Sequence, residues 1–308
     1  MRQAIPMAAT PGKKIPKAVS DRTICGLFML PALAILILMV AYPFISLLYY
    51  STLNFSILNP AKGSEFIGLD NYIRLLSRDS IWERFIFTGQ FVLATVVVQF
   101  LLGVAVAYAF QRNFRGRDLL FTVAMLPMML CPIVVGFLWR YMFNSEWGVM
   151  NYLVTLLGFE KIDWLGVPTN ALWAVVIADA WMWTPFVILL ATAAFRGIPT
   201  DINEAAEIDG ASPFFRFTRV TLPMSMPILL IAFLLRLIDA FKQSDLFFAM
   251  TGGGPGSDTE TVAFRLGKIA FSHFYTGQAS AFAVIILVII TGLSLIFVRL
   301  LTQQGRQD

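Results

Sequence analysis

The sequence predicts an all-α membrane protein with six transmembrane helices, both termini in the cytosol and a helical hairpin between the fourth and fifth spans. Three observations support this prediction. The 308 residues are 58% hydrophobic and only 14% charged, whereas a soluble domain carries roughly 25% charged residues. Six apolar runs reach the length of about 20 residues that a bilayer requires. Basic residues concentrate in alternate connections between these runs, as they do in the cytosolic loops of membrane proteins.

A basic cytosolic tail over residues 1–23 precedes the first apolar run. The six predicted spans are Ile24–Leu48, Ile86–Phe110, Leu119–Phe143, Ala171–Phe195, Met224–Met250 and Ser280–Leu301. No small-residue cleavage site follows the first run, so we interpret it as a retained helix and not as a signal peptide. We expect one six-helix transmembrane domain over residues 24–301 and a cytosolic C-terminal tail over residues 302–308.

The positions of Lys and Arg predict the orientation of these spans. Four segments hold most of them: Arg2, Lys13, Lys14, Lys17 and Arg22 in the tail, Arg112, Arg115 and Arg117 after span two, Arg196, Arg216 and Arg219 after span four, and Arg299 and Arg306 at the end. The opposite loops hold Lys62, Arg74, Arg78, Arg84, Lys161, Arg265 and Lys268. This excess of roughly two to one places both termini and the 196–223 loop in the cytosol.

The same sequence offers little for catalysis or metal binding. Cys25 and Cys131 lie in apolar runs, where neither a disulfide nor a metal site is expected, and His273 is the only histidine. The glycine-rich segment 251–256 lacks the Gly-Lys-Ser/Thr ending of a phosphate-binding loop, so a flexible turn against an extracytoplasmic partner is the better interpretation. If ATP drives this protein, another polypeptide must hydrolyse it.

A polar island between spans four and five carries helix-boundary signals. Asp201 and Glu204 have the spacing of a capping box, which predicts a short helix over Ile202–Ile208. Gly210 suits the left-handed position after that helix. Ser212 can cap a second short helix with Pro213 in its first turn. The spacing predicts a hairpin at the membrane surface, which by itself could be a simple connection between two spans.

The residues of this hairpin closely resemble the EAA loop of permeases from ABC importers. Glu204, Ala205, Ala206 and Gly210, with Leu222-Pro223 further on, match its pattern. The resemblance implies that the loop is a coupling helix, which sits in a groove of the ATPase subunit. The implied coupling residues are Glu204, Ala205, Ala206, Glu207, Asp209, Gly210, Phe214 and Phe215.

Three further strings resemble the larger, maltose-type permease subunit of carbohydrate importers. They are Gly68–Tyr72 (GLDNY) after the first span, Thr251–Gly256 (TGGGPG) after the fifth, and Gly277–Ala281 (GQASA) at the start of the sixth. The resemblance implies transport of a sugar, polyol or glycoside across the bacterial cytoplasmic (inner) membrane. It also implies a second homologous permease, two copies of an ATPase subunit that carry ATP and Mg, an extracytoplasmic solute-binding protein, and no cofactor on this chain.

Polar and aromatic residues at membrane depth are candidates for the substrate path, because ionisable groups there usually face the bundle interior. We selected them by two criteria: a shared helical face, and a distance in sequence from Glu204 equal to that of the sugar-site positions in the maltose-type permease. The selected residues are Asp179, Met182, Trp183, Phe186, Arg236, Asp239, Ala240, Gln243 and Ser244. Arg236 and Asp239 can also neutralise each other, so a purely structural pair remains an alternative for these two residues.

Two other functions compete with this interpretation. An ion-coupled secondary transporter would use the membrane Asp and Arg residues as a proton or sodium site, and an ABC importer of another solute, such as an amino acid or an ion, would share the EAA loop. The GLDNY-like and glycine-rich strings favour the carbohydrate branch. A membrane enzyme finds no support, because no nucleophile–histidine pattern is present.

Overall fold

The computed structural model describes residues 21–58 and 64–304, which form two units, Met1–Tyr49 and Tyr50–Asp308. The first unit holds most of α1 (Asp21–Ser51), in which the stretch from Phe28 onward is long and apolar enough to cross a membrane. Most of the predicted basic tail, residues 59–63 with Lys62, and Arg306 lie outside the described residues.

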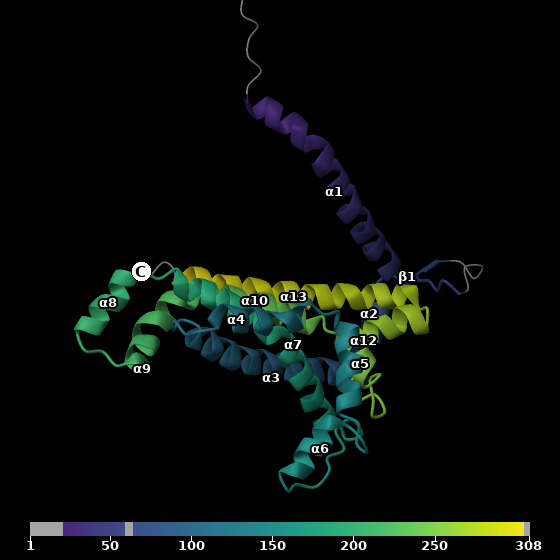
Figure 1. Cartoon of the computed structure of the whole chain (residues 1–308). Helices are drawn as coiled ribbons and strands as arrows, with labels where there is room; N and C mark the ends of the chain where they lie inside the picture. Colours follow the sequence, from purple (N-terminus) through teal and green to yellow (C-terminus); the bar gives the residue numbers. More distant parts are fainter. Residues whose placement is uncertain (1–20, 59–63, 305–308) are drawn as a thin grey trace, which may run out of the picture. The chain divides into compact units, whose positions relative to one another are not determined.

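Four more helical stretches, all in the second unit, can cross a membrane. They are α3 (Asp79–Ala109), α7 (Pro168–Arg196), the run made of α9 (Pro213–Arg216), η3 (Phe217–Thr221) and α10 (Leu222–Phe241), and α13 (Thr276–Gln304). Helix α3 packs on α7, and α10 packs on α3, α7 and α13 (Figure 1). With α1 they make five membrane-spanning candidates in the described part of the chain.

The predicted third span, Leu119–Phe143, is not one continuous helix. It consists of α4 (Arg117–Met125), η2 (Leu126–Met129) and α5 (Pro132–Met142), and the two halves meet at 98°. Leu130 and Cys131 are extended between them. The cause is local, since the residue before a proline is driven out of the helical region. Counting this bent pair as one span brings the number of candidates to six.

The predicted fifth span, Met224–Met250, is wrong at both ends. Its helix begins at Pro213 and ends at Phe241. After a break at residues 242–244, the short helix α11 (Asp245–Met250) packs on α5. The approach is close, because a Cβ added to Gly136 of α5 would lie 2.5 Å from the Cβ of Ala249.

The two ends of the second unit differ. Helices α8 (Thr200–Ile208) and α9 project at one end, where the C-terminal end of α13 also lies (Figure 1). The opposite end carries α2 (Asp70–Leu76), α12 (Val262–Gly267), η4 (Lys268–Ser272) and the two-residue strands β1 (Leu53–Asn54) and β2 (Glu65–Phe66). The strands pair antiparallel, Leu53 opposite Phe66, and every other regular element among the described residues is helical. The short helix α6 (Val149–Leu156) lies between α5 and α7 in the chain.

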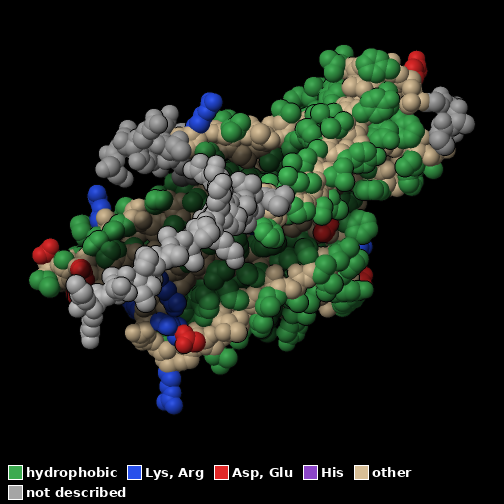
Figure 2. Space-filling model, turned by 90° about the horizontal axis from the view of Figure 1, so that it is seen from above, with side chains coloured by type: hydrophobic (Ala, Val, Ile, Leu, Met, Phe, Trp, Pro, Cys, Tyr) green, Lys and Arg blue, Asp and Glu red, His purple; other side chains and the backbone are tan. Residues whose placement is uncertain are grey.

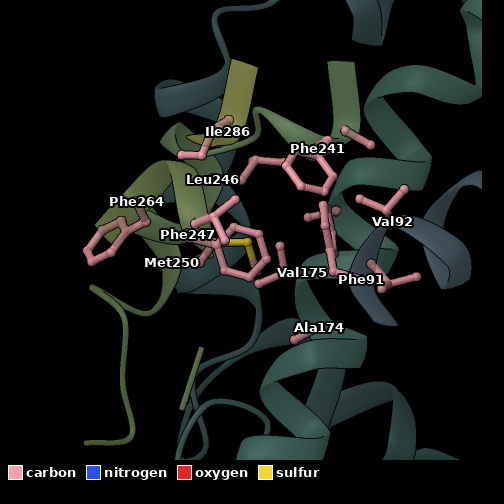
Figure 3. Close-up of a cluster of buried hydrophobic side chains, with 14 of the residues drawn as sticks. Phe91, Val92, Ala174, Val175, Phe241, Leu246, Phe247, Met250, Phe264 and Ile286 are labelled. Atoms are coloured by element: carbon pink, nitrogen blue, oxygen red, sulfur yellow. The ribbon is translucent and has the colours of Figure 1, made fainter. Parts of the chain in front are cut away.

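A hydrophobic core joins α3, α7, α11, α12 and α13 (Figure 3). At its centre the rings of Phe91 and Phe247 meet edge to face, with centroids 4.8 Å apart. Hydrophobic side chains are spread widely over the face seen in Figure 2, with Lys and Arg mainly in its left half and acidic side chains at both ends. Exposed apolar side chains suit contact with lipid, because lipid tails are as apolar as these side chains.

Candidate functional site

The first arm of the hairpin is α8, which begins at Thr200 and ends at Ile208. Its N-cap is Pro199, and no side chain caps its first turn, so the predicted capping box of Asp201 and Glu204 is wrong. Asp201 lies within the first turn instead, where its negative charge interacts favourably with the positive end of the helix dipole.

The turn after α8 is a Schellman motif, and Gly210 is its left-handed residue. Its φ is +75°, as the sequence predicts. The N–H of Gly210 donates to the carbonyl of Glu207, and the N–H of Ala211 donates to that of Ala206, each at 3.0 Å. These bonds satisfy carbonyls that the helix end leaves free. The tight turn reverses the chain between the two arms.

The second arm of the hairpin, α9, begins at the predicted cap but is longer than the predicted short helix. The Ser212 hydroxyl accepts a hydrogen bond from the N–H of Phe215 at 3.3 Å, and Pro213 occupies the first turn. The helix then passes through η3 into α10 without a break. The second arm is therefore the start of the fifth span itself and not a separate surface helix.

The tip of the hairpin exposes apolar side chains beside acidic ones. Ile208 is 86% exposed and Phe214 is 77% exposed, and Phe215 is also exposed. Glu204, Ala205, Glu207 and Asp209 are exposed, and Ala206 is half-buried. No other described residue covers this surface, so its composition suits contact with another protein.

Contacts at the base fix the hairpin to the bundle. The Tyr108 hydroxyl, near the end of α3, donates to the carbonyl of Pro213 at 3.0 Å. The Phe217 ring packs against that of Tyr108, with centroids 4.5 Å apart. Arg216 pairs with Glu207 at 2.9 Å and so links the two arms. The hairpin is therefore attached to the bundle at its base, and its tip is exposed.

A second constellation lies inside the bundle, where α3, α7 and α10 meet. Arg236 and Asp179 are fully buried and form an ion pair. The guanidinium of Arg236 also donates from Nε to Gln99 Oε1 at 2.7 Å and from Nη1 to Asp239 Oδ2 at 2.5 Å. Each of its three nitrogen atoms therefore has an acceptor, which is what a buried charge requires.

The carboxylate of Asp179 accepts further hydrogen bonds from side chains other than Arg236. Thr95 Oγ1 donates to its Oδ2 at 2.6 Å, and Gln99 Nε2 donates to the same oxygen at 2.8 Å. Gln243, just beyond α10, donates to Oδ1 at 3.2 Å. Thr95 and Gln99 were not among the predicted site residues. The signal available in the sequence was their four-residue spacing as polar groups within an apolar run.

The structure brings together five of the predicted path residues: Asp179, Trp183, Arg236, Asp239 and Gln243. The guanidinium carbon of Arg236 lies 5.1 Å from the centroid of the Trp183 ring. The indole N–H of Trp183 has no hydrogen-bond partner among the described residues. The side chain of Asp239 is 48% exposed, so this carboxylate lies at the open side of the network.

The other four predicted path residues are placed differently. Met182 and Ala240 are buried within the hydrophobic core. Phe186 is half-buried, and its ring is perpendicular to that of Trp183 at 6.5 Å. Ser244 is the N-cap of α11, and its N–H donates to Gln243 Oε1 at 3.1 Å.

Buried polar contacts hold the segment that follows the glycine-rich loop, at the opposite end of the second unit from the hairpin. Glu260 is 1% exposed and pairs with Lys268 at 2.8 Å, Arg265 at 3.3 Å and Arg84 at 3.5 Å. The Thr261 hydroxyl donates to the carbonyl of Gln243 at 2.9 Å. This last bond connects the loop directly to the buried network.

Comparisons with known proteins agree with these features. Residues 99–306 match the family described as "Binding-protein-dependent transport system inner membrane component". The trehalose/maltose transport system permease MalF of Thermococcus litoralis is 33% identical over 276 residues, covering 89% of this chain and 92% of that protein. The trehalose transport system permease SugA of Mycobacterium tuberculosis is 31% identical over 282 residues, covering 92% and 90%.

A solved structure has the same fold. It is the crystal structure of a bacterial ABC transporter involved in the import of the acidic polysaccharide alginate, with a TM-score of 0.80 and 16% identity. The match covers 93% of this chain and 98% of that one. The chain therefore belongs to the family of inner membrane components of binding-protein-dependent transport systems, and it is a multi-pass membrane protein of that family.

Proposed function

We propose that this chain is one of two unlike permease subunits in an ATP-driven importer for a sugar, polyol or glycoside. The exposed hairpin, with its EAA-type residues and its Schellman turn at Gly210, is the observation that carries the proposal. The substrate class is supported by relatives whose names state trehalose or maltose transport. Their names also favour this proposal over an ion-coupled transporter.

The proposed topology has six spans, with the bent pair α4–η2 and α5 as the third, and both termini on the cytosolic side. The positive-inside distribution of Lys and Arg supports this orientation. The contacts of Tyr108 support it too, because they hold the connection after α3 beside the hairpin, as expected if both are cytosolic. The glycine-rich loop at the other end would then face the binding protein.

Two copies of a separate ATPase subunit would bind ATP and Mg, and one of them would dock on the hairpin tip of this chain. Ile208, Phe214 and Phe215 offer the apolar contact, and Glu204 offers an acidic one. Because α9 continues through η3 into α10, a displacement of the tip would move the fifth span directly. Arg236 on that span holds α3 through Gln99 and α7 through Asp179, so all three helices would move together.

The substrate would pass the open side of the buried network. There Asp239 is half-exposed and its carboxylate can accept hydrogen bonds from hydroxyl groups. The Trp183 ring offers an aromatic face, and its N–H has no partner among the described residues. In this proposal Arg236 and Asp179 position these groups and do not themselves contact the substrate.

Coupling is tested by substitutions in the hairpin of the assembled importer. In Gly210→Ala the left-handed conformation becomes strained by roughly 1–2 kcal/mol, while the new Cβ meets no atom within 4 Å. Glu204→Gln removes an exposed charge. We expect both variants to lower the ATPase activity stimulated by the binding protein. Unchanged stimulation in both would refute the coupling role.

Gly197→Ala is the matched control, because Gly197 lies in the same loop with an ordinary φ of −75°. It should leave the stimulated activity as it is. Membrane abundance of all three variants, measured by immunoblot, separates a coupling defect from loss of the protein.

A further inference from the structure

A basic groove of about 510 Å³ lies beneath the hairpin, between the C-terminal ends of α3 and α7 and the start of α9. Four arginines line it: Arg112, Arg117, Arg196 and Arg216. Tyr108, Pro213 and Arg216, which fix the base of the hairpin, form part of its wall. The groove lies at the C-terminal ends of α3 and α7, two candidate membrane spans, and lipid headgroups surround the ends of such spans.

Half of this positive charge is already compensated. Arg117 pairs with Asp118 at 3.2 Å, and Arg216 pairs with Glu207 at 2.9 Å. The side chains of Arg112 and Arg196 are exposed and form no hydrogen bond or ion pair with another described residue. The C-terminal ends of α3 and α7 each add roughly half a negative charge, which leaves the groove with a net positive charge.

The walls of the groove are both polar and apolar. Thr192 lines it and is 5% exposed, and its hydroxyl has no hydrogen-bond partner among the described residues. A buried hydroxyl without a partner is costly unless a ligand satisfies it. The rings of Phe110 and Phe195 line the same groove. This combination fits a ligand with an anionic head and an apolar body.

We propose that the groove binds a phosphate group carried by an anionic phospholipid. Guanidinium groups recognise phosphate through paired, charge-assisted hydrogen bonds, and basic pockets at this depth bind such headgroups. The lipid would join α3, α7 and the first turn of the fifth span at the base of the hairpin. The importer's activity would then depend on anionic lipid. This site requires insertion of the chain in a membrane but does not depend on docking of the ATPase.

The test uses the whole importer in nanodiscs of phosphatidylcholine, with phosphatidylglycerol added in steps. Native mass spectrometry counts bound phosphatidylglycerol, and the stimulated ATPase activity is measured in parallel. In the double variant Arg112→Gln/Arg196→Gln we expect roughly 30-fold weaker binding, from about 1 kcal/mol per arginine. The lipid dependence of the activity should weaken with it.

Arg219→Gln is the matched control. Arg219 is exposed in η3, near the groove, but does not line it. It removes a similar surface charge and should leave phosphatidylglycerol binding unchanged. Equal binding by the wild type and the double variant, or an equal loss in Arg219→Gln, would overturn the proposal.

Two further experiments distinguish a lipid phosphate from free phosphate and from contact with the ATPase subunit. Inorganic phosphate is titrated into importer in phosphatidylcholine alone. If it binds and phosphatidylglycerol does not displace it, the ligand is free phosphate and the lipid assignment fails. If the double variant loses the ATPase subunit while phosphatidylglycerol binding is unchanged, the arginines contact that subunit and the proposal also fails. A hairpin variant such as Gly210→Ala should keep its lipid, so failure of the coupling proposal is distinguishable from failure of this one.

Discussion

Arg236 lies in the centre of the bundle with all three guanidinium nitrogens bonded, to Gln99, Asp239 and Asp179. Removing one partner of such a buried pair leaves a charge without compensation, which costs far more than the intact pair contributes. The network therefore behaves as one unit that fixes three helices. The Trp183 ring contacts the Arg236 guanidinium but donates no hydrogen bond to the network.

This difference yields a prediction for two neighbouring residues. Asp179→Ala should destabilise the fold by about 3–5 kcal/mol and lower membrane abundance and the melting temperature in detergent. Trp183→Ala should leave abundance unchanged and impair uptake, because it removes an aromatic face and no ion pair. Normal uptake kinetics in Trp183→Ala would remove this residue from the substrate path, and normal abundance of Asp179→Ala would contradict the structural role of the pair.

At the scale of elements, the packing of α3 on α7 depends on one glycine. A Cβ added to Gly103 would lie 2.6 Å from the Cβ of Val187, so the two backbones can approach only because residue 103 has no side chain. Small residues commonly allow this close approach between membrane helices. Gly89, on the same helix, has no neighbour within 4 Å of its added Cβ.

The two glycines therefore predict opposite effects of the same substitution. Gly103→Ala should lower the melting temperature, because α3 and α7 must separate. Gly89→Ala should raise stability slightly, by roughly 0.5–1 kcal/mol, since alanine favours a helix over glycine. Thermal unfolding of the purified importer in detergent measures both. A melting temperature for Gly103→Ala equal to or above that of Gly89→Ala would contradict the packing argument.

Across the whole molecule, one chain of contacts runs from the hairpin to the glycine-rich loop. The hairpin continues into α10, α10 carries Arg236, and Arg236 shares Asp179 with Gln243. The carbonyl of Gln243 accepts from Thr261 next to Glu260. Because the Glu260 carboxylate pairs with three cations, it fixes the end of this chain of contacts next to the glycine-rich loop.

Loss of Glu260 should open the outer loop. In Glu260→Ala three cations lose their shared carboxylate, so we expect faster proteolytic cleavage in the 251–261 segment and weaker stimulation by the binding protein. Glu83→Ala is the control, because Glu83 also pairs with Arg84 but is 70% exposed. Limited proteolysis of the importer in proteoliposomes measures the difference. Equal cleavage rates in the two variants would show that Glu260 does not hold the loop.

The sequence by itself determined the features whose causes are local. Apolar runs of sufficient length identified the spans, Gly210 identified the left-handed turn, and Ser212 with Pro213 identified the start of α9. It also selected Asp179, Arg236 and Asp239, because charged residues stand out in an apolar run. The break before Pro132 had a local cause as well, although the prediction of a third span over Leu119–Phe143 did not include it.

Only the tertiary structure decided which polar groups meet. Asp179 and Arg236 are 57 positions apart, and Arg84 reaches Ser257 across 173 positions. No spacing rule connects such pairs, since they come together only when segments distant in the chain pack against one another. The structure thereby added Thr95 and Gln99 to the network, moved Met182 and Ala240 into the core and gathered four arginines into one groove. Burial and partner choice depend on neighbours distant in the chain, which is why the helices could be predicted and their meeting points could not.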